Sequence, residues 1–141
     1  MAKEFDRQAL IQQALDVLSH SYAPYSGFNV AAAVLMDNGE VYTGVNIENA
    51  SYSATVCAER TAIFKAISEN KGAKIVAIAI VGGKAGKVID YCAPCGVCRQ
   101  VMREFGEPDT MRVIVAKTPT DYQEMSLEGL LPLSFGPEFL A

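Results

Sequence analysis

The 141-residue sequence lacks several features that mark whole classes of protein. No apolar run reaches the roughly 20 residues that a membrane-spanning helix needs, so we expect no membrane partner. The first residues are charged and no apolar signal-peptide core follows them, which predicts a cytoplasmic protein. Internal repeats, linkers and low-complexity segments are also missing. These absences predict a single domain of ordinary size over residues 1–141.

Positive charge and histidine are also scarce. The chain has 12 basic and 16 acidic side chains, for a net charge of −4, and its basic residues are scattered. Because binding to DNA or RNA normally needs a basic stripe, we expect no polymeric nucleic acid as substrate. The one histidine, His20, has no motif partner and is not assigned to a metal. Half of the residues are hydrophobic and 20% are charged, as in globular proteins.

Cysteine is the chemically informative residue that is present. In a reducing compartment, four clustered cysteines indicate metal binding or catalysis more often than disulfides. Cys57, Cys95 and Cys98 supply three thiols for one metal ion, and Glu59 lies two residues beyond the first of them. A catalytic zinc site has three protein ligands and keeps a fourth position for water. The motifs therefore predict such a site, with Glu59 placed to handle protons.

A second interpretation of the cysteines uses all four. Cys92, Cys95 and Cys98 are evenly spaced and could join Cys57 in a closed four-sulfur zinc site or an iron–sulfur cluster, as in a metal-stabilised binding module. On spacing alone this interpretation competes closely with the catalytic one. Pro94 counts against it, since Cys92 then lies outside the helix start that presents the other two. A redox dithiol is a weaker alternative because it leaves Cys57 unexplained.

Apolar periodicity predicts the elements that carry these motifs. Three- and four-residue steps indicate helices over 5–19, 55–69 and 95–105. Apolar or alternating runs indicate strands over 28–36, 41–47, 75–81, 111–116 and 122–127, and an Asn-Gly pair suits a hairpin turn between the first two. This order of elements predicts one mixed sheet with helices packed on it.

The predicted helices place both halves of the metal site at helix N-termini. Three thiolates around Zn²⁺ make a centre of net charge −1, and unpaired N–H groups and helix dipoles at such ends would offset it. Helix N-termini also lower thiol pKa values. Arg60 and Arg99 each follow a cysteine directly, so we expect their guanidinium groups to hydrogen-bond the sulfurs and tune the metal.

The sequence closely resembles the small, homotetrameric, zinc-dependent cytidine deaminases, and the likeness covers nearly the whole chain. A Cys-x-Glu followed by Pro-Cys-x-x-Cys belongs to the zinc deaminase signature. The motifs that carry the resemblance are Tyr25-Ser26-x-Phe28-x-Val30-x-Ala32-Ala33, Asn46-Ile47-Glu48-Asn49-Ala50-Ser51-Tyr52, Cys57-Ala58-Glu59-Arg60-Thr61-Ala62, Pro94-Cys95-Gly96-x-Cys98-Arg99-Gln100 and Leu130-Leu131-Pro132-x-Ser134-Phe135.

The resemblance implies a fold and a reaction. The fold would be a single three-layer α/β/α domain with a mixed, roughly five-stranded sheet. The reaction would be hydrolytic deamination of cytidine and deoxycytidine to uridine and deoxyuridine plus ammonia, in pyrimidine salvage. Cys57, Cys95 and Cys98 would hold one Zn²⁺ per subunit. Zinc-bound hydroxide would attack C4 of cytosine, with Glu59 as the proton shuttle.

The resemblance also implies a set of substrate contacts. Phe28 would pack against the pyrimidine ring, Asn46 and Glu48 would hydrogen-bond the ribose, and the backbone N–H of Ala58 would contact the base carbonyl. Residues that complete a neighbouring subunit's pocket in a homotetramer would be Ala50, Tyr52 and Phe135. From the residues alone, these positions would be ordinary core, interface or solvent-facing side chains.

The sequence is also compatible with two other activities, and it contains one segment that is similar to a phosphate-binding loop. A related aminohydrolase for a modified cytosine nucleoside, such as blasticidin S, is the nearest alternative activity. A polynucleotide-editing deaminase shares the metal motif, but the short chain and acidic balance disfavour it. The glycine- and lysine-rich segment 82–87 lacks the register of a phosphate-binding loop, and we interpret it as a flexible turn.

Overall fold

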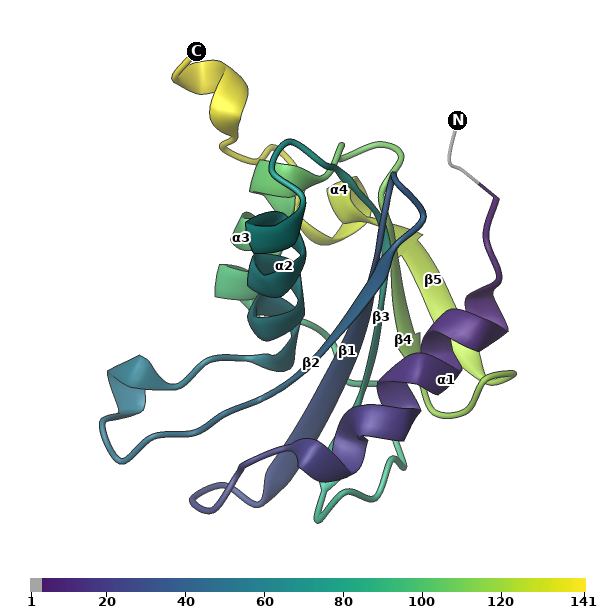
Figure 1. Ribbon diagram of the computed structural model, residues 1–141, viewed down its shortest axis with the longest axis vertical. Helices are drawn as coiled ribbons and strands as arrows, with labels where there is room; N and C mark the ends of the chain where they lie inside the picture. Colours follow the sequence, from purple (N-terminus) through teal and green to yellow (C-terminus); the bar gives the residue numbers. More distant parts are fainter. Residues whose placement is uncertain (1–3) are drawn as a thin grey trace.

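Five strands form one mixed sheet in the computed structural model, which describes residues 4–141 (Figure 1). Only the third and fourth strands run parallel, and every other neighbouring pair is antiparallel. The sheet confirms the predicted strand number and mixed character. Across the sheet the strands follow the order β2 (Val41–Val45), β1 (Phe28–Met36), β3 (Ile75–Lys84), β4 (Arg112–Ala116) and β5 (Tyr122–Ser126).

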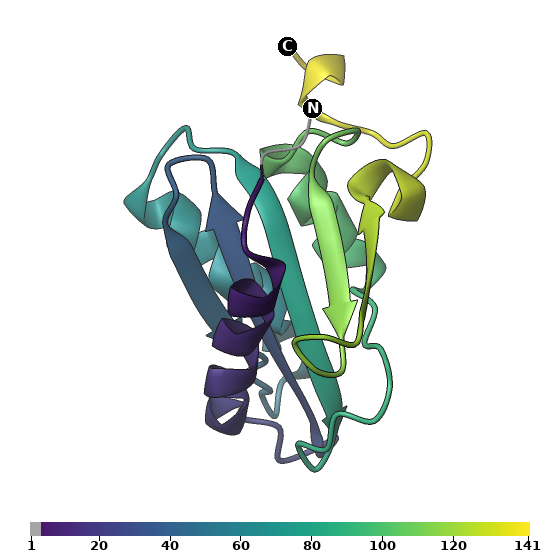
Figure 2. The same cartoon turned by 90° about the vertical axis from the view of Figure 1, so that its right-hand side faces the viewer.

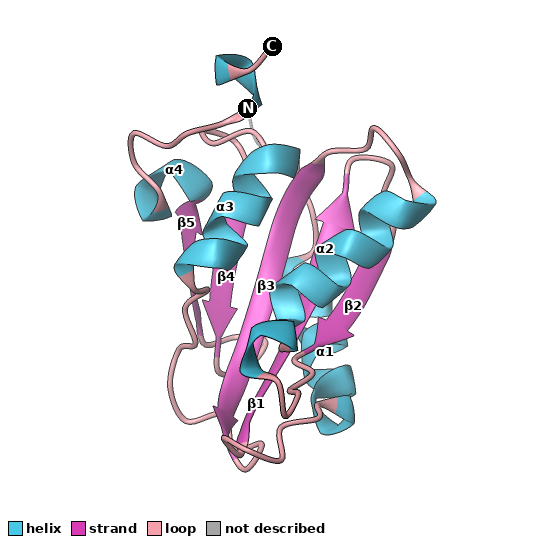
Figure 3. Ribbon diagram, turned by 90° about the vertical axis from the view of Figure 1, so that its left-hand side faces the viewer, coloured by secondary structure: helices cyan, strands magenta, loops and turns pink. Residues whose placement is uncertain are grey.

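Helices cover both faces of this sheet, which confirms the three-layer arrangement (Figures 2 and 3). Helix α1 (Arg7–Val17) packs on one face, while α2 (Ala58–Glu69) and α3 (Gly96–Phe105) lie on the other. Parallel strands need a crossover, and α3 supplies it between β3 and β4. The short helix α4 (Leu127–Leu130) follows β5. Among residues 4–141, no helix has the length and apolar character that crossing a membrane requires.

Two apolar cores result from the alternation of side chains along the central strands. The middle of β1 and of β3 is buried on both faces, under α2 and α3 on one side and under α1 on the other. The residues facing α2 and α3 are Ala32, Val34, Met36, Ile78 and Ile80, and those facing α1 are Ala31, Ala33, Ala77, Ala79 and Val81.

Several element ends differ from the sequence predictions. Helix α2 begins at Ala58 rather than at residue 55, because Tyr52–Ala54 forms a separate 3₁₀ turn. Cys95, predicted as the first helical residue, is the N-cap of α3, and the helix itself begins at Gly96. Strand β2 ends at Val45, and helix α4 was not predicted.

Gly44 allows α2 to lie close against strand β2. A Cβ atom at this position would stand 2.5 Å from the backbone nitrogen of Ala62 and 2.8 Å from the carbonyl oxygen of Ala58. Both atoms belong to the first turns of α2, so any larger residue would push the start of the helix away from the sheet. This close contact fixes how far the N-terminal end of α2, which carries Cys57 and Glu59, lies from the sheet.

Candidate metal centre and active site

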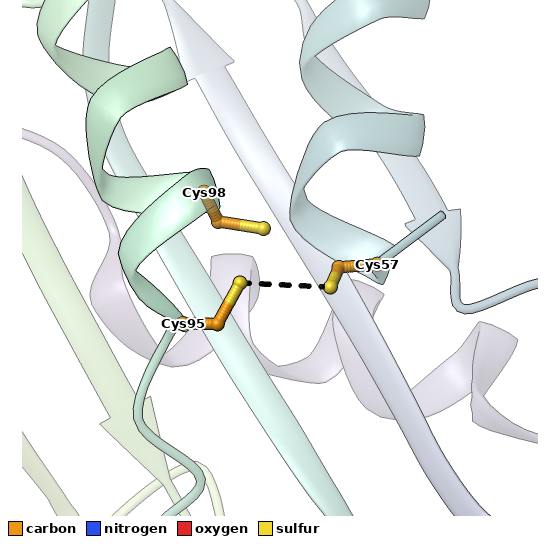
Figure 4. Close-up of side chains that lie close together, drawn as sticks. All are labelled: Cys57, Cys95 and Cys98. Atoms are coloured by element: carbon orange, nitrogen blue, oxygen red, sulfur yellow. Dashed lines mark hydrogen bonds between the residues drawn. The ribbon is translucent and has the colours of Figure 1, made fainter. Parts of the chain in front are cut away.

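Two helix N-termini bring three cysteine sulfurs together (Figure 4). Cys57 is the N-cap residue of α2, Cys95 is the N-cap residue of α3, and Cys98 lies in the first turn of α3. Their Sγ atoms all lie within 4.8 Å of one another, and those of Cys57 and Cys95 are 3.8 Å apart. The three cysteines therefore form a group that could hold one metal ion, as the sequence predicted.

The sulfur positions fit zinc. With Zn–S bonds of about 2.3 Å in a tetrahedron, two ligand sulfurs stand about 3.8 Å apart, which matches Cys57 and Cys95. The hydrogen bond from Cys98 and, secondarily, Arg60 lower the pKa of Cys57 to about 5, whereas the bond to Cys57 and burial raise the pKa of Cys98. One thiolate so close disfavours ionisation of the next, and a bound dication would remove that penalty.

The two arginines behave differently from each other. Arg60 donates from Nη2 to Cys57 Sγ at 3.4 Å, and its Nε is buried without a hydrogen-bond partner in the described part of the chain. Its charge therefore offsets the negative sulfurs. Arg99 instead donates from Nε to the carbonyl of Pro94 and from Nη1 to that of Leu130, both at 2.8 Å. Arg99 thus holds the loop before α3 to the C-terminal segment.

Cys92 stays outside the group of three sulfurs among residues 4–141. Its side chain is half-buried against strand β3, where a Cβ on Gly82 would meet its Sγ at 3.1 Å. Burial, with the nearby charges of Glu59 and Cys57, raises the pKa of Cys92 to about 11. The absence of Cys92 from the group of three sulfurs counts against the four-sulfur interpretation.

Glu59 is a buried carboxyl group beside the sulfurs, with only 4% of its surface exposed. It lies in the first turn of α2, two residues after Cys57. Burial, reinforced by the charge of Cys57, raises its pKa to about 7. A carboxyl group with a pKa near neutrality can both accept and donate a proton at physiological pH, as acid–base catalysis requires.

A cavity of about 280 Å³ opens beside Glu59, at the small end of the range for ligand sites. Four of the predicted substrate contacts line it, namely Phe28, Asn46, Glu48 and Ala58. Other lining residues were not predicted from the sequence. Two of them, Ser26 and Val30, lie within the motifs that carry the family resemblance but had been given no role. The full lining is Ser26, Phe28, Val30, Asn46, Glu48, Thr55, Val56, Cys57, Ala58, Glu59, Cys92, Ala93 and Cys95.

Backbone pairing around Ile47 carries Asn46 and Glu48 to the cavity. Ile47 exchanges two hydrogen bonds of 3.0 Å with Val56, just before the first metal-site cysteine. The side chain of Asn46 is largely occupied: Oδ1 accepts from the backbone N–H of Val30 and from a serine hydroxyl, and Nδ2 donates to the carbonyl of Phe28 at 2.8 Å. The other amide N–H of Asn46 has no partner among residues 4–141 and remains for a ligand.

Three predicted contacts do not line this cavity: Ala50, Tyr52 and Phe135. Tyr52 borders an adjoining depression with Tyr25, and its side chain is 76% exposed. The C-terminal segment that carries Phe135 lies at the opposite end of the molecule from the loop of residues 46–57 (Figures 1 and 3). Phe135 itself lies against helix α3, where its carbonyl accepts a hydrogen bond from Gln100 at 2.9 Å.

The fold and the site together define a metal-binding α/β protein whose sulfur ligands lie beside a buried acid and a small-molecule cavity. Residues 5–117 match the model of the family described as the cytidine and deoxycytidylate deaminase zinc-binding region. Because this match spans most of the chain, the protein belongs to that family.

Individual relatives agree with the family match. The cytidine deaminase of Halalkalibacterium halodurans is 48% identical over 133 residues, which cover 94% of this chain and 96% of that protein. The cytidine deaminase of Sporosarcina psychrophila is 41% identical, with 96% of each chain covered. Among solved structures, cytidine deaminase from Burkholderia pseudomallei superposes with a TM-score of 0.79 at 42% identity, covering 90% of this chain and 97% of that one.

Proposed function

We propose that the protein catalyses the hydrolytic deamination of cytidine and deoxycytidine, giving uridine or deoxyuridine and ammonia in pyrimidine salvage. The observation that carries this proposal is that buried Glu59 lines one cavity together with Cys57 and Cys95, two of the three clustered cysteines. The curated relatives named cytidine deaminase, alike over nearly their full length, support the same reaction.

The three cysteines would hold the metal, and Arg60 would support one of them. Zinc, when bound by Cys57, Cys95 and Cys98, supplies a Lewis acid that lowers the pKa of water at the site. The guanidinium group of Arg60 donates to Cys57 and offsets the charge of three thiolates, which would otherwise weaken that acidity. The free N–H groups at the starts of α2 and α3 act in the same direction.

Glu59 would move the protons of the reaction. Its carboxylate takes one proton from the attacking water and delivers it to N3 of cytosine. It then takes the second proton from the new hydroxyl on C4 and delivers it to the amino group as the C4–N bond breaks. The new C4–O bond replaces that C4–N bond, so water and ammonia balance.

The remaining cavity residues would orient the nucleoside. Phe28, whose side chain is 40% exposed, packs against the pyrimidine ring. The backbone N–H of Ala58, at the start of α2, donates to the base carbonyl. The sugar hydroxyls meet the remaining N–H of Asn46 and the carboxylate of Glu48. These contacts describe a free nucleoside, with no polymeric nucleic acid involved.

The direct experiment follows the ultraviolet absorbance of cytidine and of deoxycytidine with zinc-loaded protein. We expect stoichiometric formation of the uracil nucleoside and ammonia, and loss of turnover when a chelator removes the zinc. Blasticidin S serves as the competing substrate. Turnover of that compound alone, by folded zinc-loaded protein, would replace the proposed substrates with a modified cytosine nucleoside.

We further propose that the chain is a single domain that works in the cytoplasm as a homotetramer with shared active sites. The one continuous sheet supports a single domain, and four unpaired cysteines suit a reducing compartment. Exposed apolar side chains near the chain's C-terminal end support contact between copies: Leu133, Phe135, Phe139 and Leu140 are all more than half exposed.

Complementation between inactive variants tests the shared sites. We expect wild-type protein to sediment as a tetramer, and Phe135→Ala and Glu59→Ala variants each to lose activity. Co-assembly should restore part of it, because one pocket in a mixed tetramer regains an intact Glu59 from one subunit and an intact Phe135 from another. Activity that stays at the sum of the separate variants would show that each chain completes its own site.

A further inference from the structure

The carboxylate of Glu48 is held by the loop of residues 21–27. Its Oε1 accepts the backbone N–H groups of Tyr25, at 2.9 Å, and Ser26, at 3.1 Å. Its Oε2 accepts the hydroxyl of Ser26, and that hydroxyl in turn accepts the N–H of Phe28 at 3.0 Å. The bond from Ser26 keeps the pKa of Glu48 below its usual range. The N–H of Phe28 thus orients the Ser26 hydroxyl, whose own hydrogen points at Glu48.

This arrangement limits what Glu48 can do for a ligand. An ionised carboxylate offers about four lone-pair positions, and the protein already uses three of them. One position is therefore left at the cavity, enough for a single hydroxyl donor. Because the Ser26 hydroxyl takes one of the two lone-pair positions of Oε2, its placement decides where the other position points.

A tight turn at the end of strand β3 donates hydrogen bonds to the loop of residues 21–27, which carries Ser26. Lys84 donates from Nζ to the carbonyl of Ser26 at 2.8 Å, and the N–H of Ala85 donates to the carbonyl of Gly27 at 2.7 Å. The turn bends sharply: Ala85 has a φ of +56°, an unfavourable value for a residue with a side chain. A Cβ on Gly83 would stand 1.9 Å from the carbonyl oxygen of Lys87.

The sequence predicted a flexible turn over residues 82–87, but in the structure this turn is held to the Ser26 loop by hydrogen bonds. Its two hydrogen bonds reach consecutive carbonyl groups, those of Ser26 and Gly27. They tie the end of β3, where Lys84 pairs with Phe28 across the sheet, to the loop that carries the donors of Glu48. The order of contacts runs from Lys84 to Ser26 and from Ser26 to Glu48.

We infer that Ser26, held by the turn of Lys84 and Ala85, is a positioning residue that aims Glu48 at one sugar hydroxyl of the nucleoside. The inference rests on the proposed function, because that function supplies the sugar. Its consequence is selectivity: the protein distinguishes nucleosides by the presence of the one hydroxyl that Glu48 accepts, and Ser26 and Lys84 sharpen that distinction without touching the reacting atoms.

The test compares kinetics of variants on cytidine, 2′-deoxycytidine and 3′-deoxycytidine. We expect Ser26→Ala to raise KM about tenfold with little change in kcat, since a hydrogen bond to a charged group is lost away from the reaction centre. The rise should vanish for the deoxynucleoside that lacks the hydroxyl accepted by Glu48, and Ser26→Thr should restore the wild-type values. An equal rise for all three nucleosides, or no rise, would overturn the inference.

Lys84→Met supplies a second variant with a matched control. It should raise KM selectively and in the same direction as Ser26→Ala, but less, because the hydroxyl of Ser26 remains. Lys87→Met removes the same charge from the same turn, and the Lys87 side chain makes no hydrogen bond or ion pair with residues 4–141. Equal effects of the two lysine changes would mean that charge, rather than the contact with Ser26, is responsible.

A measurement without substrate separates this inference from the proposed function. Carbon NMR titration of Glu48 in the wild type should give a carboxyl pKa below the ordinary value, and Ser26→Ala should move it upward, with Ser26→Thr unchanged. If the protein deaminates no cytosine nucleoside yet shows this shift, the anchoring of Glu48 stands and the proposed function fails. If deamination proceeds and Ser26→Ala leaves the Glu48 pKa unchanged, the anchoring fails and the proposed function stands.

Discussion

Replacing Glu59 by glutamine or alanine is expected to leave one zinc per chain in place while kcat falls by at least about 10³-fold. Glu59 is buried beside the sulfurs but is not one of the three grouped ligands. Either change therefore removes the group that would move protons and keeps the group that would hold the metal. Glutamine keeps the volume and removes the negative charge, so a loss of activity with that variant cannot come from a cavity.

Glu69→Gln is the matched control for this experiment. It makes the same chemical change on the same helix, in the last turn, where Glu69 is exposed and pairs with Lys65 at 3.1 Å. Because an exposed pair contributes at most about 1 kcal/mol, activity and zinc content should both stay at wild-type levels. Zinc is measured by mass spectrometry and turnover by absorbance. Substantial activity in the zinc-loaded Glu59→Gln protein would remove Glu59 from the proposed mechanism.

The sequence predicted best where local pattern and tertiary contact agree. Continuous apolar runs marked the central strands, because the middle of β1 and of β3 is buried on both faces, and the bounds of β1 match the predicted 28–36. Helix starts were less predictable. Residues 55–57 have helical neighbours in sequence, yet the pairing of Val56 with Ile47 holds them extended, and that long-range contact leaves no local signal.

The three clustered cysteines were predictable because metal-binding cysteines can be recognised in a sequence by their spacing. A helix N-terminus then fixes where their side chains point. Hydrogen-bond partners were not. Arg60 and Arg99 both follow a cysteine, yet only Arg60 donates to a sulfur, while Arg99 binds carbonyl groups of Pro94 and Leu130. The choice depends on how the C-terminal segment packs against α3, which sequence spacing does not contain.

The contacts of Ser26 illustrate the same limit. Its hydroxyl is directed at Glu48, 22 residues away, and its carbonyl accepts from Lys84, 58 residues away. Each residue by itself would be an ordinary loop side chain. Only the folded arrangement, in which the end of β3 lies against the loop before β1, makes them neighbours. Positioning roles of this kind require a structure, whereas ligand roles could be predicted from the motif.

Replacing Cys95 by serine is expected to abolish tight zinc binding without unfolding the protein. The weakening should exceed about 100-fold, the upper range for altering groups that merely support a ligand, because a serine hydroxyl is a poor substitute for a soft thiolate. Cys95 suits this experiment since it is exposed and is the N-cap of α3, a position that serine favours. Circular dichroism should therefore remain that of the wild type.

Cys92→Ser is the matched control, because it makes the same atomic change three residues earlier, and it also decides between the three-sulfur and four-sulfur sites. With three ligands, Cys92→Ser keeps one zinc per chain, and its melting temperature still rises when zinc is added, as mass action requires for a ligand that binds the folded state. Cys95→Ser loses that rise. The contrast follows from the structure, in which the sulfurs of Cys57, Cys95 and Cys98 cluster within 4.8 Å and Cys92 lies outside them. If Cys92→Ser lost zinc as completely as Cys95→Ser, the ligand set would be four sulfurs, no position would remain for water, and the hydrolytic mechanism would fail with it.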